Sequence, residues 1–381
     1  MIYKKIFAFL MVFCLMATAV SFPANSLSEE EITAPSAILM EPASKEILYE
    51  QNSHEQRACA SVTKIMTLLL VMEALDSGKI TLDETVTASA KAASMGGSDI
   101  WLEEGEQMSV DDLIKATAVA SANDAAVALA EHICGDLGEF IAQMNNKAKE
   151  LGMNDTTFKN CNGLDEEGHV TSAYDVALMS AALMEHPKIF GYTSIWMDNL
   201  RGGETQIVNT NKLLKTYNGI TGLKTGTTDD AGCCMSASAC RDGLNLVAVV
   251  LGCKTGTQRF KEAAALLDYG FANYKYTNLS VPEDFPQEIE VVGGMIPQTS
   301  LSCNVSQGAL LPKSQSAEIK REIDLPESVE APVESGQTIG TLIYSCADKE
   351  LGRFDITANE DIASIGFSPV LSLIYNALIA L

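Results

Sequence analysis

The sequence predicts an α/β fold of the α+β type, in which helices surround an antiparallel sheet and a small β-rich domain and a C-terminal hydrophobic helix follow. From about residue 32 to residue 273, short β-type runs alternate with helical patterns, which is typical of a sheet covered by helices. After residue 276 the helical pattern stops, and prolines separate short β-type runs. The 381 residues, 47% of them hydrophobic, are too many for one ordinary domain and too apolar for a disordered chain.

The N-terminal end predicts an export signal over residues 1–26, because two lysines precede an apolar run at residues 6–20 and small residues follow. Cleavage is expected after Ala19 or Ser26. The alternative is a transmembrane helix, but an apolar run of 15 residues is short for a hydrocarbon core of about 30 Å. We therefore expect an exported, extracytoplasmic protein.

The elements between residues 32 and 273 follow from local patterns. Apolar runs around turn residues predict two β-hairpins: residues 37–40 with 47–49, and residues 233–240 with 244–251. Helical periodicity predicts four helices: residues 61–75, 110–134, 175–185 and 258–274. The second of these helices is expected to be interrupted near Ser121.

The C-terminal end, residues 366–381, carries no charged side chain and is dominated by Leu, Ile, Val and Ala. A helix there would place Ser368, Ser372 and Asn376 on one line, which leaves a wide apolar face. This face fits a membrane surface, although a helix packed on the body of the protein has the same pattern.

The composition excludes several classes of partner. The 26 Lys and Arg against 50 Asp and Glu give a formal net charge of −24, which repels phosphate backbones, so we expect no nucleic-acid partner. The chain has no CxxC or HExxH motif and its four histidines are scattered, so no metal and no cofactor are expected. Ten cysteines are too few for a disulfide scaffold, and Cys233 and Cys234 would point to opposite faces of a strand.

A serine nucleophile with a lysine base is predicted at Ser61 and Lys64. The chain has no GxSxG elbow, so a serine would need a base other than histidine. Ser61 begins a predicted helix and Lys64 lies three residues further, so both side chains share one face of the first turn. A lysine serves as a base only when its pKa falls well below about 10.4, which burial and a neighbouring cation both achieve. Lys224 is the expected second cation.

Two further triplets carry groups that suit this chemistry. Ser121-Ala122-Asn123 falls where the helix is interrupted, and it supplies a hydroxyl to relay a proton and an amide to hold a substrate carbonyl. Lys224-Thr225-Gly226 precedes the second hairpin, so it is expected on a strand at the sheet edge, where Gly226 lets a substrate backbone approach. Second copies of the two patterns, at residues 302–304 and 254–256, lack this context.

The combination of motifs is specific, although each motif alone is weak. SxxK at the start of a helix, SxN at a helix break and KTG on a strand occur in this order between residues 61 and 226, as in penicillin-binding proteins and class A β-lactamases. With these motifs the chain resembles the serine D-alanyl-D-alanine carboxypeptidases, the low-molecular-mass penicillin-binding proteins, from about residue 33 to residue 362. The matching sequence segments are residues 60–66, 120–125 and 222–226, which contain the motifs, and residues 162–165.

The resemblance implies four parts: a signal peptide at residues 1–26, a catalytic domain at 27–275, a β-rich domain at 276–362 and a helix at 366–381 that rests on the membrane. The implied substrates are peptidoglycan stem peptides, with β-lactam antibiotics as covalent inhibitors, at the cell wall or the outer face of the cytoplasmic membrane. Many close relatives have SGN where this chain has SAN at residues 121–123, and the added methyl group predicts an altered fit.

The resemblance also implies the chemical steps. Ser61 would attack the carbonyl carbon of the penultimate D-Ala to form an acyl-serine, and Lys64 would take its proton. Ser121 would pass a proton to the departing D-Ala. Asn123 would orient the substrate amide.

Substrate binding is implied for the strand triplet and its neighbours. Lys224 and Thr225, beside Gly226, would receive the terminal carboxylate of the substrate. Arg259, after the last predicted strand, would help to bind the same carboxylate. The backbone N–H groups of Ser61 and Thr227 would form the oxyanion hole.

Three other functions stay open from the sequence. A class A β-lactamase would need a deacylating glutamate, for which Glu166 and Glu167 lie in a plausible loop, although residues 162–165 follow the carboxypeptidase text. A DD-endopeptidase would cut cross-links between stem peptides. A non-catalytic penicillin-sensing or wall-binding protein would use the β-rich domain, but the complete set of motifs argues against it.

Overall fold

The computed structural model describes residues 27, 31–305, 308–314, 319–347, 349–367, 370, 371 and 375. The expected signal peptide lies outside the described residues, and so does most of the expected C-terminal helix. Within the described ranges, no helix is long and apolar enough to cross a membrane. The chain divides into two compact units, one made of the residues up to 239 with 246–273, the other of residues 240–245 with those from 274 onward.

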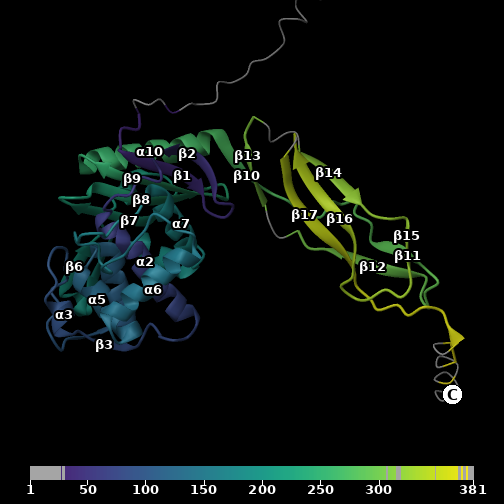
Figure 1. The fold of residues 1–381 in the computed structure, drawn as a ribbon, viewed down its shortest axis with the longest axis horizontal. Coiled ribbons are helices and arrows are strands. Elements are labelled where there is room, and N and C mark those ends of the chain that lie inside the picture. Colours follow the sequence, from purple (N-terminus) through teal and green to yellow (C-terminus); the bar gives the residue numbers. More distant parts are fainter. Residues whose placement is uncertain are drawn as a thin grey trace, which may run out of the picture. The chain divides into compact units, whose positions relative to one another are not determined.

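A five-stranded antiparallel sheet forms the centre of the first unit (Figure 1). Its strands are β1 (Ser36–Glu41), β2 (Glu46–Gln51), β7 (Ile220–Thr228), β8 (Gly232–Arg241) and β9 (Leu244–Cys253), in the order β2-β1-β9-β8-β7. The two predicted hairpins are β1–β2 and β8–β9, and β7 lies at the sheet edge as expected. Cys233 and Cys234 are neighbours on β8, and both are free thiols.

Helices cover both faces of this sheet. In Figure 1, α10 (Gly256–Asn273) lies along one face and the other labelled helices lie on the opposite side. A buried carboxylate on α10 binds the segment just before β1. Glu262 accepts hydrogen bonds from the Ala34 N–H at 2.8 Å and from the Thr33 hydroxyl at 2.6 Å. The chain therefore enters β1 at a fixed position on α10.

The opposite face carries α2 (Lys64–Asp76), α4 (Val110–Lys115), α5 (Asn123–Cys134), α6 (Leu137–Glu150) and α7 (Ala173–Met184). Helix α2 is apolar on nearly all sides and is buried accordingly. Ser109, Asp136 and Ser172 begin α4, α6 and α7, because each side chain accepts a hydrogen bond from a backbone N–H three residues further. The predicted interruption is a π-helical turn, Ala116–Ala120, between α4 and α5.

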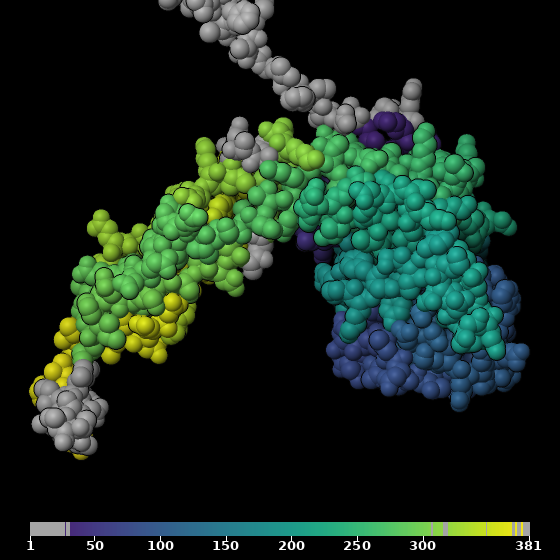
Figure 2. Space-filling view, turned by 180° about the vertical axis from the view of Figure 1, so that it is seen from behind, coloured from purple at the N-terminus to yellow at the C-terminus, as the bar shows by residue number. Residues whose placement is uncertain are grey.

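The remaining elements of the first unit are short: η1 (Ala60–Thr63), β3 (Thr85–Thr87), α3 (Ala90–Ala93), β4 (Gln107–Ser109), η3 (Pro187–Ile189), α8 (Phe190–Thr193), β5 (Met197–Leu200), η4 (Arg201–Gly203), β6 (Thr205–Val208) and α9 (Leu213–Thr216). Strands of three or four residues are too short to show a period of two, so the sequence did not predict the pairs β3–β4 and β5–β6. The blue and teal parts of the chain, which carry these pairs, adjoin on one face of the first unit (Figure 2).

The second unit is β-rich, as predicted. A six-stranded sheet has the order β14-β16-β17-β12-β11-β15, and β10 pairs with β13. The strands are β10 (Tyr274–Asn278), β11 (Glu288–Val292), β12 (Gln298–Cys303), β13 (Gly308–Pro312), β14 (Ile319–Asp324), β15 (Ser328–Glu330), β16 (Thr338–Cys346) and β17 (Lys349–Ala358). Alternate residues of β16, Leu342, Tyr344 and Cys346, are buried in its core, which is the period of a half-buried strand.

Candidate active site

Ser61 and Lys64 lie on one turn of 3₁₀ helix that leads into α2. The turn η1 ends at Thr63, and α2 begins at Lys64. Residues three apart eclipse each other in a 3₁₀ helix, so the serine and lysine side chains lie on one face. The Lys64 Nζ donates a hydrogen bond to the Ser61 Oγ at 2.9 Å. Ala60, which precedes them, has a φ of 50°, a left-handed conformation that costs about 1–2 kcal/mol for a residue with a Cβ.

Lys64 is fully buried and has three polar partners. Besides Ser61, its Nζ donates to the Asn123 Oδ1 at 2.5 Å and to the backbone carbonyl oxygen of Asn162 at 2.7 Å. Burial lowers the pKa of Lys64 from 10.5 to about 7, because a low-dielectric environment disfavours the charged form. The low pKa expected for this lysine is therefore present, but burial, rather than the charge of Lys224, is its main cause.

The SxN triplet lies where the helix is interrupted. Ser121 ends the π-helical turn in a left-handed conformation, with φ 64° and ψ 27°, and α5 restarts at Asn123. Asn123 donates from its Nδ2 to the Gly96 carbonyl at 2.6 Å, which leaves its Oδ1 to accept from Lys64. Ser121 is buried, and its hydroxyl has no hydrogen-bond partner among the residues that the structure describes.

The KTG triplet lies on the edge strand β7. Lys224 is buried and donates from its Nζ to the Thr225 carbonyl at 2.9 Å. Its pKa is lowered well below the ordinary value of 10.5, first by burial and then by the positive charges of Lys64 and Arg259. The Thr225 hydroxyl is 2.6 Å from the Thr210 hydroxyl.

Gly226 brings β7 against the serine turn. A Cβ atom at this position would lie 2.7 Å from the Cys59 carbonyl oxygen and 2.8 Å from the Ser61 backbone nitrogen. Both neighbours are backbone atoms, so they cannot move aside as a flexible side chain would. The absence of a side chain at Gly226 therefore sets the distance between the strand and the serine.

Arg259 lies in the first turn of α10 and reaches β7. Its Nη1 donates to the Gly226 carbonyl and to the Thr227 hydroxyl, each at 2.8 Å. The guanidinium also lies 4.9 Å from the centre of the Phe260 ring. Arg259 therefore adds a half-buried positive charge directly beside the KTG triplet.

The loop from residue 158 to 170 contributes site residues to which the sequence assigned no role. Asn162 supplies the carbonyl oxygen that accepts from Lys64, and Gly163 packs on the serine turn. A Cβ atom at Gly163 would lie 1.9 Å from the Ala60 carbonyl oxygen, and its φ of 83° also favours glycine. The only sequence signal for this contact is the Asn-Gly pair within residues 162–165.

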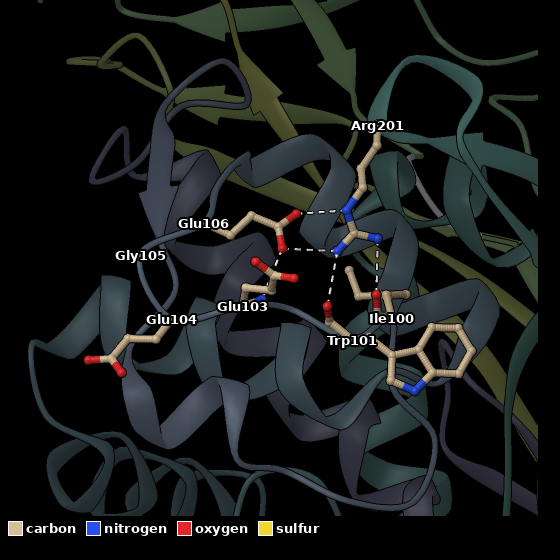
Figure 3. Close-up of a pocket in the computed structure, with 7 residues that line it drawn as sticks. All are labelled: Ile100, Trp101, Glu103, Glu104, Gly105, Glu106 and Arg201. Carbon is tan, nitrogen blue, oxygen red and sulfur yellow. Dashed lines mark hydrogen bonds and ion pairs between the residues drawn. The ribbon is translucent and has the colours of Figure 1, made fainter.

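A separate hollow of about 580 Å³ opens beside the loop that precedes β4 (Figure 3). Seven residues line it: Ile100, Trp101, Glu103, Glu104, Gly105, Glu106 and Arg201. Arg201 closes one side, with its Nε 2.7 Å from the Glu106 Oε1 and its Nη1 donating to the Ile100 carbonyl at 3.0 Å. The residues that bond to Lys64 do not line this hollow.

Within the described parts of the chain, no group of three or more His, Cys, Asp and Glu side chains could hold a metal ion. The fold, with Ser61 and Lys64 at the start of a central helix, Asn123 at a helix break and Lys224 on the edge strand, defines the class of penicillin-binding proteins and serine β-lactamases. These elements come from three separate parts of the sequence and meet in the first unit.

Comparisons with known proteins narrow this class. The sequence model of the D-alanyl-D-alanine carboxypeptidase family matches residues 23–255, and that of the penicillin-binding protein 5 C-terminal domain matches residues 274–364. The D-alanyl-D-alanine carboxypeptidase DacF of Bacillus subtilis is 41% identical over 344 residues, which are 89% of this chain and 88% of that protein. Penicillin-binding protein 5 from Haemophilus influenzae has a crystal structure that aligns with a TM-score of 0.75 at 30% identity, over 89% of this chain and all of that chain.

A third relative was solved with an antibiotic. The crystal structure of penicillin-binding protein D2 from Listeria monocytogenes in its ampicillin-bound form aligns with a TM-score of 0.58 at 35% identity, over 62% of this chain and 97% of that chain. The chain belongs to the D-alanyl-D-alanine carboxypeptidase family. It is a serine-type D-alanyl-D-alanine carboxypeptidase, a hydrolase of peptidoglycan, as the motifs predicted.

We expect Gly226→Ala to abolish most of the activity, because the new methyl group would push β7 away from Ser61. A misplacement of about 1 Å at a reacting group can cost on the order of 100-fold in rate. The rate of D-Ala release from a pentapeptide measures the effect, and circular dichroism checks the fold. Gly256→Ala, in the second KTG copy, is the matched control, because its Cβ would have no neighbour closer than 3.9 Å. Equal activity of the two variants would contradict the prediction.

Proposed function

We propose that Ser61 is the nucleophile of this carboxypeptidase and that Lys64 is its general base. The observation that carries the proposal is the buried Lys64 Nζ, which lies 2.9 Å from the Ser61 Oγ and belongs to a lysine with a pKa of about 7. At neutral pH a large fraction of such a lysine is uncharged, so its nitrogen has a lone pair that can accept the serine proton.

In the proposed acylation step, the Ser61 Oγ forms a bond to the carbonyl carbon of the penultimate D-Ala while its proton passes to Lys64. The bond from this carbon to the nitrogen of the terminal D-Ala then breaks. Ser121 relays the proton to the departing nitrogen. In the second step, a water oxygen bonds to the acyl carbon and a water proton passes to Lys64. The bond from this carbon to the Ser61 Oγ then breaks, and Lys64 returns the proton to the Ser61 Oγ. The sum is hydrolysis of one peptide bond.

Asn123 is proposed to orient the substrate amide. An asparagine side chain has two N–H donors, and one of them is bonded to the Gly96 carbonyl. The second donor is available for a carbonyl oxygen of the substrate, while the Oδ1 stays on Lys64. One side chain would thus fix the base and the substrate in the same geometry.

The substrate carboxylate is proposed to bind at Lys224 and Thr225, beside Gly226, with Arg259 as a further cation. The support is the position of the Arg259 Nη1, which is 2.8 Å from the Thr227 hydroxyl on the same strand. The backbone N–H groups of Ser61 and Thr227 are proposed as the oxyanion hole, in which the loss of one donor typically costs about 10²–10³ in rate.

β-Lactams are proposed to acylate the same serine. Attack on the strained lactam carbonyl would follow the acylation step, except that the leaving nitrogen stays attached through the opened ring. The ampicillin-bound form of the Listeria relative supports this proposal. Against a β-lactamase, Glu166 and Glu167 are exposed, and the Glu166 Oε2 accepts a hydrogen bond from Asn160 at 3.1 Å.

We expect Ser61→Ala to abolish both D-Ala release from a pentapeptide and covalent labelling by fluorescent penicillin, because no other hydroxyl among the described residues is bonded to Lys64. Mass spectrometry of the labelled wild-type protein should place the penicilloyl group on residue 61. Ser302→Ala, in the second SxN pattern, is the control and should keep both activities. Rapid penicillin turnover without D-Ala release would instead indicate a β-lactamase, and release from cross-linked muropeptides an endopeptidase.

We expect the rate constant of acylation by penicillin to rise with pH around a midpoint of about 7, since only the uncharged form of Lys64 can take the proton. The negative charge of Asp99 raises the pKa of this lysine, so Asp99→Asn should move the midpoint to lower pH. Stopped-flow measurement of the acylation rate between pH 5 and 9 gives both midpoints. A rate that still increases toward pH 10 in both proteins would exclude Lys64 as a base of lowered pKa.

We propose that residues 1–26 direct export and that residues 366–381 lie on the membrane surface. The support is the apolar run behind two lysines at one end and the absence of charged side chains at the other. Cell fractionation should recover the chain outside the cytoplasm and shortened by its signal. Deletion of residues 366–381 should move it from the membrane to the soluble fraction, and an unchanged distribution would contradict membrane contact.

A further inference from the structure

The loop at residues 158–170 packs against the turn that carries Ser61 and contacts it at several residues. Ala60 enters the turn in a left-handed conformation, and such backbone strain persists only where neighbouring contacts determine the conformation. Gly163 packs on the Ala60 carbonyl, and the Asn162 carbonyl accepts from Lys64. These two contacts involve backbone atoms of the loop. A third contact joins two side chains.

This third contact is the hydrogen bond between His169 and Thr63. The His169 Nε2 is 2.8 Å from the Thr63 Oγ1, and the His169 side chain is buried. The other ring nitrogen, Nδ1, accepts a hydrogen bond from the Lys159 backbone N–H at 3.0 Å. A neutral imidazole has one proton, so this proton lies on Nε2 and is donated to Thr63. The Thr63 hydroxyl is in turn 3.3 Å from the Cys59 Sγ.

The position of Thr63 on the turn gives this bond its importance. Ser61 and Lys64 eclipse each other on one face of the 3₁₀ turn, whereas Thr63 lies about 120° from that face. A bond at Thr63 therefore fixes the rotation of the turn without contacting the reacting atoms. Because β7 meets the same turn at Gly226, a rotated turn would also displace Ser61 from the edge strand.

We propose that His169 is a positioning residue for acylation. Through its hydrogen bond to Thr63 it holds the 3₁₀ turn that carries Ser61 in a fixed rotation. This inference rests on the proposed role of Ser61. His169 acts as a neutral hydrogen-bond donor rather than as a base, since its partner is Thr63 and not Ser61. Burial lowers the pKa of His169 to about 4, which agrees with a neutral ring throughout the working pH range.

Two substitutions separate the bond to Thr63 from the bond to Lys159. The amide of His169→Asn reaches only as far as Nδ1, so it can keep the Lys159 contact but not the Thr63 contact. The amide of His169→Gln reaches as far as Nε2, so it can donate to Thr63. We expect the Asn variant to lower the acylation rate constant by penicillin about tenfold or more with unchanged binding, and the Gln variant to stay within about threefold of wild type.

Three further variants and a second measurement complete the test. Thr63→Val should have the same effect as His169→Asn, and the double variant should be no slower than either. His54→Asn, at an exposed histidine bonded to Asp155, is the control and should acylate normally. Hydrogen–deuterium exchange of the peptide around residues 57–66 should increase in the Asn variant and not in the Gln variant.

The outcomes distinguish the two proposals. Equal acylation by the Asn and Gln variants, or equal losses that follow a shared fall in melting temperature, would overturn the role of His169. Unchanged exchange in the Asn variant would also overturn it, even if the wild-type protein is acylated at Ser61. A wild-type protein that is not acylated by penicillin would contradict the role of Ser61. If hydrogen–deuterium exchange around residues 57–66 still increases only in the Asn variant, the role of His169 in holding the turn is retained.

Discussion

The buried amino group of Lys64 is the constraint on which the rest of the site depends. Removal of a charged amine from water costs several kcal/mol unless acceptors replace the water, and here the acceptors come from three segments: Ser61 on the same turn, Asn123 at the start of α5 and the carbonyl of Asn162. The π-helical turn before Ser121 is part of this arrangement, since it lets the helix restart at Asn123. One nitrogen atom therefore sets where a turn, a helix and a loop must lie.

The charge of the site opposes the charge of the chain. The protein has a formal net charge of −24, yet Lys64, Lys224 and Arg259 are close enough for the first and third to lower the pKa of the second. Like charges that repel one another in a buried place are stabilised when an anion arrives. The carboxylate that ends a D-Ala-D-Ala peptide is such an anion, so the cations that lower the pKa of Lys224 in the free enzyme suit the substrate of this family.

The sequence predicted the parts of the site that are local. A three-residue spacing on a turn, a helix break and a triplet before a hairpin each leave a pattern, and the position of the triplet at the sheet edge followed from the hairpin after it. The contacts of the loop at residues 158–170 leave no such pattern, because Asn162 acts through its backbone carbonyl and His169 reaches a threonine 106 positions away. The sequence indicated both burial and a neighbouring cation as causes of a low Lys64 pKa, but it could not rank them, since burial depends on packing from all sides.

The lowered pKa of Lys64 has a consequence for folding. In the unfolded chain this residue is an ordinary lysine with a pKa of about 10.4, which is protonated at neutral pH, and residues 64, 123 and 162 are far apart. An unprotonated lysine amine at neutral pH is thus a property of the native state and not of the sequence motif. In a preparation that is partly misfolded, every molecule has the SxxK motif, but only the native molecules have an unprotonated Lys64. The turnover rate per total protein would therefore report the native fraction.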